Sequence, residues 1–479
     1  MKLTVSKGVF DGIHIPNSNI CVSHLLYADD ALFLGEWSKK NIDNLARILR
    51  CFYVASGLKV NFTKSKVYGI GAPLQEANNW ACRLRCEPAS VPFTFLGVPI
   101  GANMNRIATW QPVMEKLKSK LSSWKAKTLS FGGRVTLVKA VLGSIPIYFL
   151  TIFNAPIGVI NLLEKIRRQF IWGGPNCNRN INWVAWGKII APKKVGGLDL
   201  GSIRSLNLAL LTKWLWRLNN EPNALWVKII KGLHFLNGEE QGICLRSHWN
   251  GVWRSIVKCK AILDRIIIPF DEVMKPGIPG QGWVSPFVVN AEFCMALLRE
   301  RIERADFPVC DGRFPWLKMI PLKVLGFVWR AKQNKIATSE ALRNRGIVLE
   351  SSLCGVCRES EETGDHLLVS CPLAKDIFQS IYNWCNVQVS GLQSVSNMID
   401  FASKWGNCPN KRKTLITILF GTLWCLWRAR NDKIFNKAQW QPAKIVSIIQ
   451  SQTFNWVKYR GEKTKLEWSL WIKNPLNCN

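Results

Sequence analysis

Two adjacent carboxylates, Asp29 and Asp30, interrupt an otherwise apolar stretch near the start of the chain. They belong to the tetrapeptide Tyr27-Ala28-Asp29-Asp30, which follows Leu25-Leu26 and precedes Ala31-Leu32-Phe33-Leu34. A buried carboxylate is unfavourable unless it is paired or binds a metal ion. The pattern therefore has two interpretations: an ordinary turn that exposes both aspartates at its tip, or a β-hairpin whose tip holds divalent cations such as Mg²⁺.

The residues after this hairpin favour a helix followed by a strand. Ser38 is a suitable N-cap, and Gly57 lies where a helix commonly stops. We expect a short strand to follow. Five apolar residues recur on one face of the predicted helix: Ile42, Leu45, Ile48, Leu49 and Phe52.

Four potential metal ligands lie close together later in the chain. Cys354 and Cys357 form a C-x-x-C knuckle, and His366 and Cys371 follow with eight and then four residues between ligands. Three thiolates and one imidazole complete a tetrahedral zinc site with no open position for chemistry. We therefore predict a structural zinc ion, the alternative being a chance cluster of reduced thiols.

These motifs and their order resemble the reverse transcriptases of non-LTR (LINE-type) retrotransposons, particularly those common in plants. The Tyr27 to Asp30 hairpin is similar to the metal-holding hairpin of the palm in that family. Further similar segments are the one after the catalytic hairpin (57–66), the primer-grip hairpin (91–101), the start of the thumb (121–134), the helical connector (182–217) and the beginning of a reverse-transcriptase zinc-binding domain (314–330).

The resemblance implies RNA-directed DNA synthesis, a nucleotidyl transfer, as the ancestral activity. It also implies that Asp29 coordinates the catalytic metals, with Asp30 assisting. Tyr27 would lie near the incoming nucleotide and Lys64 near its phosphates. The residues that it implies in nucleic-acid binding are Phe95, Leu96, Gly97, Lys125 and Arg134.

The resemblance also implies that the catalytic site is incomplete. A polymerase palm needs a further aspartate on a separate strand, which in this family would precede residue 1 together with the fingers. We expect Asp11 to shape a turn rather than to replace that aspartate. The isolated chain is therefore expected to be inactive and to use Mg²⁺ only if the site is completed.

Two alternatives remain open. In the first, the missing half of the polymerase is supplied in trans or by a longer product. In the second, the chain is a non-catalytic nucleic-acid-binding protein or an inert remnant of an element. We expect no ribonuclease H activity, because the last fifty residues contain only three acidic residues, too few for a site of four carboxylates: Asp432, Glu462 and Glu467.

The charge balance favours a polyanionic partner. The chain has 64 Lys and Arg residues against 32 Asp and Glu residues, a net charge of +32. We predict RNA and DNA as partners, bound as an RNA–DNA duplex or as the element's RNA, with affinity that falls steeply with salt. The 23 tryptophans include candidates for base stacking, but Trp214 and Trp216 lie in an apolar helical stretch and are expected in the core.

No membrane segment or secretory signal is expected. The longest apolar stretch, residues 415–427, is shorter than the roughly 20 residues of a membrane span, so we predict a buried helix. The protein is predicted to be intracellular, nuclear or cytoplasmic, and not secreted, with mostly reduced cysteines. Cys310 and Cys385 are expected as buried thiols. The oligomeric state is left open, and four histidines are given no ligand role: His14, His24, His234 and His248.

We expect an α+β fold that is mostly helical. The expected order is a truncated reverse-transcriptase palm (1–105), a helical thumb and connector (106–235), a linker region (236–283), a zinc-binding domain (284–385) and a helical basic tail (386–479).

Overall fold

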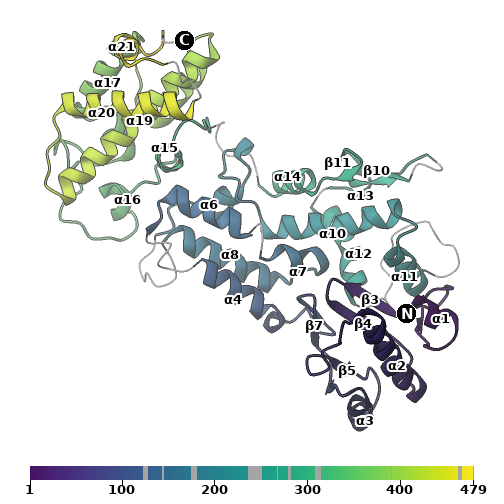
Figure 1. The fold of residues 1–479 in the computed structure, drawn as a ribbon. Coiled ribbons are helices and arrows are strands. Elements are labelled where there is room, and N and C mark those ends of the chain that lie inside the picture. Colours follow the sequence, from purple (N-terminus) through teal and green to yellow (C-terminus); the bar gives the residue numbers. More distant parts are fainter. Residues whose placement is uncertain are drawn as a thin grey trace. The chain divides into compact units, whose positions relative to one another are not determined.

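A computed structural model describes most of the chain as two compact units (Figure 1). The first unit consists of Met1–Met114, Pro146–Asn161 and Ile203–Ile302, and the second of Glu115–Ile145, Leu162–Ser202 and Glu303–Asn479. Each unit is thus assembled from three separated stretches of sequence. The described residues are 1–121, 128–142, 145–173, 181–235, 251–266, 268–278, 282–307, 314–389, 391–461 and 466–477.

Short two-stranded sheets and helices alternate at the start of the first unit. The expected hairpin is formed by β3 (His24–Tyr27) and β4 (Asp30–Phe33), which pair antiparallel with Tyr27 opposite Asp30. A second hairpin joins β7 (Phe93–Phe95) to β8 (Val98–Ile100). The other elements here are α1 (Lys2–Ser6), β1 (Ile13–His14), β2 (Cys21–Val22), α2 (Lys39–Ser56), β5 (Lys66–Tyr68), α3 (Leu74–Leu84), β6 (Glu87–Ala89) and the 3-10 helix η1 (Ile107–Trp110).

The predicted helix and the short strand after it are both confirmed. The Ser38 hydroxyl caps α2 by accepting a hydrogen bond from the Asn41 amide at 3.2 Å. Gly57 ends the helix with φ 73°, a left-handed conformation that glycine adopts without strain. Residues 57–65 contain no strand. The strand β5 starts at Lys66 because its pairing partner is β6, a parallel neighbour that α3 places beside it.

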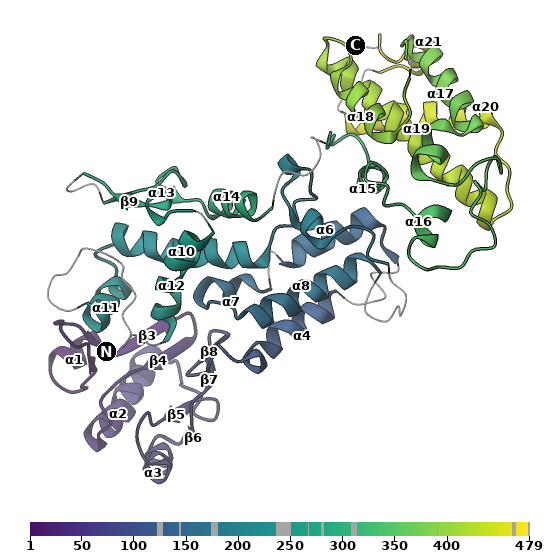
Figure 2. The ribbon, with the colours of Figure 1, turned by 180° about the vertical axis from the view of Figure 1, so that it is seen from behind.

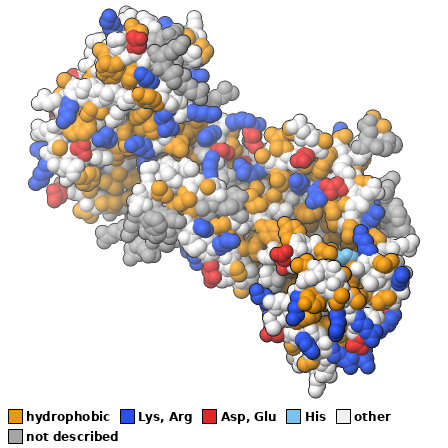
Figure 3. All heavy atoms as spheres, in the orientation of Figure 1, with side chains coloured by type: hydrophobic (Ala, Val, Ile, Leu, Met, Phe, Trp, Pro, Cys, Tyr) orange, Lys and Arg blue, Asp and Glu red, His pale blue; other side chains and the backbone are white. Residues whose placement is uncertain are grey.

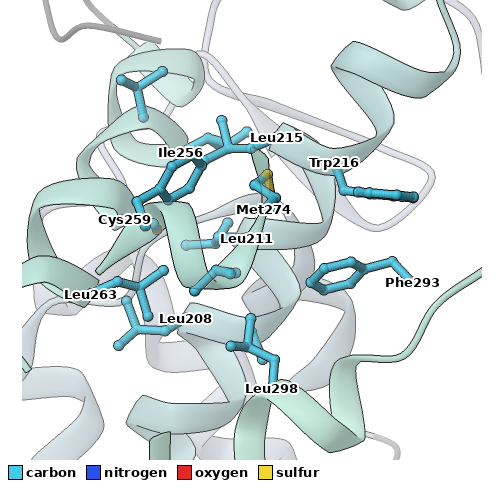
Figure 4. Packing of buried hydrophobic residues seen from close by; sticks show 14 of the residues in the cluster. Leu208, Leu211, Leu215, Trp216, Ile256, Cys259, Leu263, Met274, Phe293 and Leu298 are labelled. Carbon is cyan, nitrogen blue, oxygen red and sulfur yellow. The ribbon is translucent and has the colours of Figure 1, made fainter. Parts of the chain in front are cut away.

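The core of the first unit is built between two helices, α10 (Ile203–Asn220) and α12 (Gly251–Arg265). Leu211 and Leu215 of α10 face Ile256 and Cys259 of α12 in Figure 4. The surrounding elements are α7 (Ile147–Ile152), α11 (Leu225–His234), α13 (Phe270–Val273), β9 (Lys275–Pro276), β10 (Trp283–Val284), β11 (Val288–Val289), β12 (Glu292–Phe293) and α14 (Met295–Asp306).

The expected packing of two tryptophans is confirmed. Trp216 is buried in the core of the first unit. Trp214 packs against it, and its indole N–H donates to the carbonyl of Thr151 at 2.7 Å. Both rings therefore pack against the core of the first unit.

One buried amide connects two helices of the first unit. Asn207, on α10, is 1% exposed. Its side-chain NH₂ donates to the carbonyls of Leu150 at 2.7 Å and Phe153 at 2.9 Å, and its oxygen accepts from the Ala155 amide at 2.9 Å. The side chain therefore satisfies backbone groups left unpaired where α7 ends.

The second unit contains the long helix α19 (Pro409–Phe435), which packs against α15, α17, α18 and α20 (Figure 2). Its middle turns are buried on all sides, which confirms the prediction of a buried helix at 415–427. The unit also holds most of α4 (Gln111–Lys120) and of α8 (Ile157–Ile171). Its remaining elements are α6 (Phe131–Leu142), α9 (Trp186–Ile190), the 3-10 helix η2 (Lys193–Val195), α15 (Leu322–Ala331), α16 (Ser339–Arg343), α17 (Pro372–Cys385), α18 (Val395–Lys404), α20 (Pro442–Asn455) and α21 (Trp468–Lys473).

The predicted fold class is confirmed, because helices dominate both units and the strands are few and short. Within the described part of the chain, no helix is both long enough and apolar enough to cross a membrane.

Candidate zinc centre

The structure brings the four predicted zinc ligands together. The Sγ atoms of Cys354, Cys357 and Cys371 and a ring nitrogen of His366 all lie within 4.8 Å of one another. Cys354 and Cys371 are buried, and the other two ligands are half-buried. This is the one cluster of three or more His, Cys, Asp or Glu side chains with metal-binding geometry among the described residues.

A tight backbone turn presents the first two ligands. The Cys354 amide donates to the carbonyl of Ser360 at 2.7 Å, and the Cys354 carbonyl accepts from the Arg358 amide at 2.8 Å. Gly355, between the two cysteines, packs so closely that a β-carbon there would lie 2.8 Å from the Ile434 side chain. A larger residue at this position would therefore have to displace the Ile434 side chain of α19.

The other two ligands lie at either end of one π-helical turn, η3 (His366–Ser370). The Thr363 hydroxyl accepts from the His366 amide at 2.9 Å and so begins the turn. The Cys371 amide donates to the His366 carbonyl at 2.7 Å and closes it. Cys371 is also the N-cap residue of α17. The wider π-turn thus allows His366 and Cys371 to meet the knuckle together.

Electrostatics within the cluster favour one thiolate. A hydrogen bond from Cys371 lowers the pKa of the Cys354 thiol to about 5. The same hydrogen bond raises the pKa of Cys371. Cys357 and the Nε2 atom of His366 are 3.3 Å apart. The sulfur and nitrogen atoms of the cluster therefore already share protons through hydrogen bonds. A bound cation would replace these protons.

These residues fit a zinc ion. In a tetrahedral site with zinc–sulfur bonds of about 2.3 Å, the ligand atoms lie about 3.8 Å from one another. The observed limit of 4.8 Å requires only small side-chain movements. All four positions are filled by protein groups, so the set suits a structural site with no open position.

A buried ion pair lies directly behind the knuckle. Glu362 is 0% exposed and Arg430, on α19, is 5% exposed. The guanidinium binds the carboxylate with two N–H groups, at 2.5 Å to Oε1 and 3.1 Å to Oε2. The same carboxylate accepts from the amides of Gly355 at 3.2 Å and Ser339 at 3.0 Å. Glu362 therefore connects the knuckle, α16 and α19 in one network.

Further contacts hold the cluster against its neighbours. The Lys433 ammonium of α19 donates to the carbonyl of Val356, inside the knuckle, at 2.8 Å. The Asp365 carboxylate, beside His366, accepts from the Val395 amide at 2.9 Å and so meets the start of α18.

The roles of Glu362 and Arg430 were not predicted from the sequence. The available signal was an arginine within the otherwise buried stretch of α19, which a carboxylate has to compensate.

The predicted catalytic residues lie at an exposed hairpin tip. Tyr27 is 66% exposed, and Asp29 and Asp30 are also exposed. Ala28, in the tight turn, has φ 49°. Lys64 lies in a separate exposed turn, where its amide donates to the Asn61 carbonyl at 3.2 Å. Their catalytic roles stay predictions. Among the described residues, no third carboxylate joins Asp29 and Asp30 in a metal-binding group.

Asp11 is held at the start of α2. Its amide donates to the Asn41 side-chain oxygen at 2.8 Å, and its carboxylate lies 3.2 Å from the Lys40 ammonium. Both contacts connect it to α2, so its carboxylate is already paired.

The five predicted nucleic-acid contacts are spread over both units. Phe95, Leu96 and Gly97 form the tip of the β7–β8 hairpin, where Tyr148 donates its hydroxyl to the Leu96 carbonyl at 2.9 Å. Arg134 lies on α6. Lys125, Cys310 and His248 lie outside the described residues. Cys385 is buried as predicted, and its burial raises the pKa of its thiol to about 12.

Comparison with known proteins relates this part of the chain to reverse transcriptases. Residues 296–378 match the family described as zinc-binding in reverse transcriptase. The matched segment contains all four clustered ligands, and it ends before α19. The match supports a reverse-transcriptase-related origin for the chain.

Two plant proteins are also similar. A protein of Arabidopsis thaliana named "Putative ribonuclease H protein" is 26% identical over an alignment that covers 55% of this chain and 54% of that protein. An uncharacterized mitochondrial protein of the same plant is 24% identical over 148 residues, 31% of this chain and 94% of that protein. The chain therefore spans about half the length of the first of these relatives.

We expect Cys354→Ser to abolish stoichiometric zinc binding, because it removes a thiolate that the other ligands cannot replace. Cys385→Ser is the matched control, since that thiol is buried outside the cluster, and it should retain zinc. Lowering the pH should release zinc from the wild-type chain, because protons compete for the thiolates. Metal analysis after gel filtration measures all three. Equal zinc content in both variants would contradict the assigned ligand set.

We expect Glu362→Gln to destabilise the zinc centre by about 3–5 kcal/mol, because it leaves the buried Arg430 guanidinium without a counter-charge. Glu361→Gln is the control. The neighbouring Glu361 forms an exposed ion pair with Arg343, so its loss should cost less than about 1 kcal/mol. Urea-induced zinc release, followed with a chelating dye, reports both. Similar midpoints for the two variants would show that the buried pair does not stabilise the centre.

Proposed function

We propose that this chain is part of a reverse transcriptase derived from a non-LTR retrotransposon, and that its surviving activity is nucleic-acid binding on a zinc-stabilised scaffold. The observation that carries the proposal is the Cys₃His cluster, formed within the segment that matches the reverse-transcriptase zinc-binding family. The order of the hairpins and the Arabidopsis relatives support it further.

The zinc ion would have a structural role. Cys354, Cys357, His366 and Cys371 would hold it, and the ion would supply cross-linking between the knuckle and the N-terminus of α17. With four protein ligands no position is left for water or substrate. The Glu362–Arg430 pair then connects the cross-linked knuckle to α19, the longest helix described in the second unit.

Nucleic-acid binding follows from charge and origin. The net charge of +32 favours a polyanion. Figure 3 shows Lys and Arg side chains dispersed over the visible face, with fewer Asp and Glu side chains among them. Such a surface contacts phosphates through many separate cations. Binding should therefore depend on salt more than on base sequence.

The competing function is RNA-directed DNA polymerisation, with Mg²⁺ held by Asp29 and Asp30. The antiparallel hairpin with Tyr27 opposite Asp30 favours it, because this arrangement exposes both carboxylates at one tip. Two-metal catalysis requires ions held in fixed geometry. Two carboxylates on a single turn supply too few ligands, so we propose that the isolated chain is inactive and that a further segment or partner would have to complete the site.

We expect the zinc-loaded chain to bind a labelled RNA–DNA duplex with strongly salt-dependent affinity. If it contacts about four phosphates, the affinity should fall roughly 100-fold between about 50 and 200 mM salt, because each contact releases counterions. Fluorescence anisotropy across a salt series measures this. A control duplex of unrelated sequence should bind equally well. Absence of binding at low salt would refute the proposed function.

We expect no RNA-templated primer extension by the isolated chain with Mg²⁺. Asp29→Ala and Asp43→Ala are the paired variants for this assay, since Asp43 is also accessible but forms an ion pair with Arg83 on α3. Extension by wild type that is abolished only in Asp29→Ala would contradict the proposed inactivity and establish the polymerase alternative.

A further inference from the structure

A pocket in the second unit lies away from the zinc centre and has no assigned role. Its volume is about 390 Å³. It is lined by Phe131 and Arg134 of α6, Trp172 just after α8, Trp183, and Arg330 of α15. These residues come from three distant stretches of sequence, and all belong to one compact unit.

The pocket contains two arginines and no carboxylate among its described lining residues. Arg134 donates one guanidinium N–H to the Ile171 carbonyl at 3.0 Å, while its Nε is buried without an acceptor. The Arg330 Nε donates to the Gly326 carbonyl, at 3.3 Å. Neither guanidinium has an ion-pair partner in the described part of the chain. Two cations are thus held near each other uncompensated.

The unfavourable burial of the two guanidinium groups lowers the pKa of each. Burial, and secondarily the positive charge of Arg134, lowers the pKa of Arg330 to about 10. Burial also lowers the pKa of Arg134. An anion between them would remove the repulsion and supply the missing acceptors.

Aromatic rings form the rest of the pocket wall. Phe131 and Trp172 pack with ring centroids 5.5 Å apart. The Arg330 guanidinium lies 4.8 Å from the Phe131 ring. The Trp172 indole N–H is a further buried donor without an acceptor. Trp183 is stacked under a third cation, Arg345, at 4.4 Å. The lining therefore offers cations and hydrogen-bond donors, with the aromatic rings packed against the guanidinium groups.

We propose that this pocket binds a backbone phosphate of an RNA or DNA strand, between Arg134 and Arg330. The inference rests on the proposed nucleic-acid binding and names a specific site for it. Guanidinium groups match phosphate oxygens with two parallel N–H donors. Contacts to the phosphate backbone carry no sequence information, so the site requires no particular sequence.

The test is binding of a fluorescein-labelled oligouridylate to the full, zinc-loaded chain across a salt series. The variants are Arg134→Gln/Arg330→Gln, and Arg134→Lys, which keeps the charge but removes the planar donor pair. Lys375→Gln removes a surface cation on α17 as the control. Zinc content and thermal unfolding establish that each variant is folded. Unlabelled AMP and an oligoglutamate peptide serve as competitors.

We expect the double variant to bind the oligonucleotide at least about tenfold more weakly. Its salt slope should be smaller by about 0.7 for each phosphate of the single strand that the protein no longer neutralises. Arg134→Lys should bind slightly more weakly than wild type with the slope retained, and Lys375→Gln should match wild type. If AMP displaces the oligonucleotide from wild type but not from the double variant, the phosphate-binding assignment is supported for free nucleotides as well.

Three outcomes would overturn the proposal. Equal affinity of wild type and the double variant would refute the pocket while leaving the proposed function intact. Displacement by oligoglutamate at concentrations where AMP has no effect would indicate that Arg134 and Arg330 bind an acidic peptide instead. Failure of wild type to bind any nucleic acid would refute both the phosphate-binding role of the pocket and the proposed function. If the double variant does not fold, the Arg134→Lys comparison decides between the first outcome and the proposal.

Discussion

The buried pair of Glu362 and Arg430 is the interaction on which the organisation of the candidate zinc centre depends. A carboxylate with no solvent exposure is stable only when several donors surround it, and here the donors come from the knuckle, α16 and α19. The pair therefore couples the position of the zinc ligands to the packing of a 27-residue helix. The family match ends at residue 378, but the contacts that support its ligands continue into the helix beyond.

The candidate zinc centre and the arginine pocket, both in the second unit, have opposite electrostatic requirements. In the zinc centre, thiol groups close together lower the pKa of Cys354 and raise that of Cys371, an imbalance that a cation relieves. In the pocket between α6 and α15, burial and a second guanidinium lower the pKa of Arg330, an imbalance that an anion relieves. A zinc-stabilised scaffold carrying an anion pocket is consistent with the proposed role in nucleic-acid binding.

Local patterns predicted local structure well, because their causes act within a few residues. The Ser38 cap, the Gly57 stop and the buried stretch at 415–427 all depend on hydrogen bonds or burial that one segment supplies for itself. The exact position of the strand after α2 depends instead on a more distant segment. A strand exists only where a partner pairs with it, and β6, the partner of β5, lies across an intervening helix.

The sequence by itself determined the identity and spacing of the four candidate zinc ligands, the helical character of the chain and its excess of positive charge, because each is a property of residue type and near neighbours. Only the tertiary structure decided that Arg430 compensates Glu362 across 68 positions, that Arg134 meets Arg330 beside Trp172, and that two units are built from interleaved segments. Such contacts depend on how distant segments pack. Residue spacing along the chain does not reveal that packing, since it indicates only which residues one turn or one hairpin can bring together.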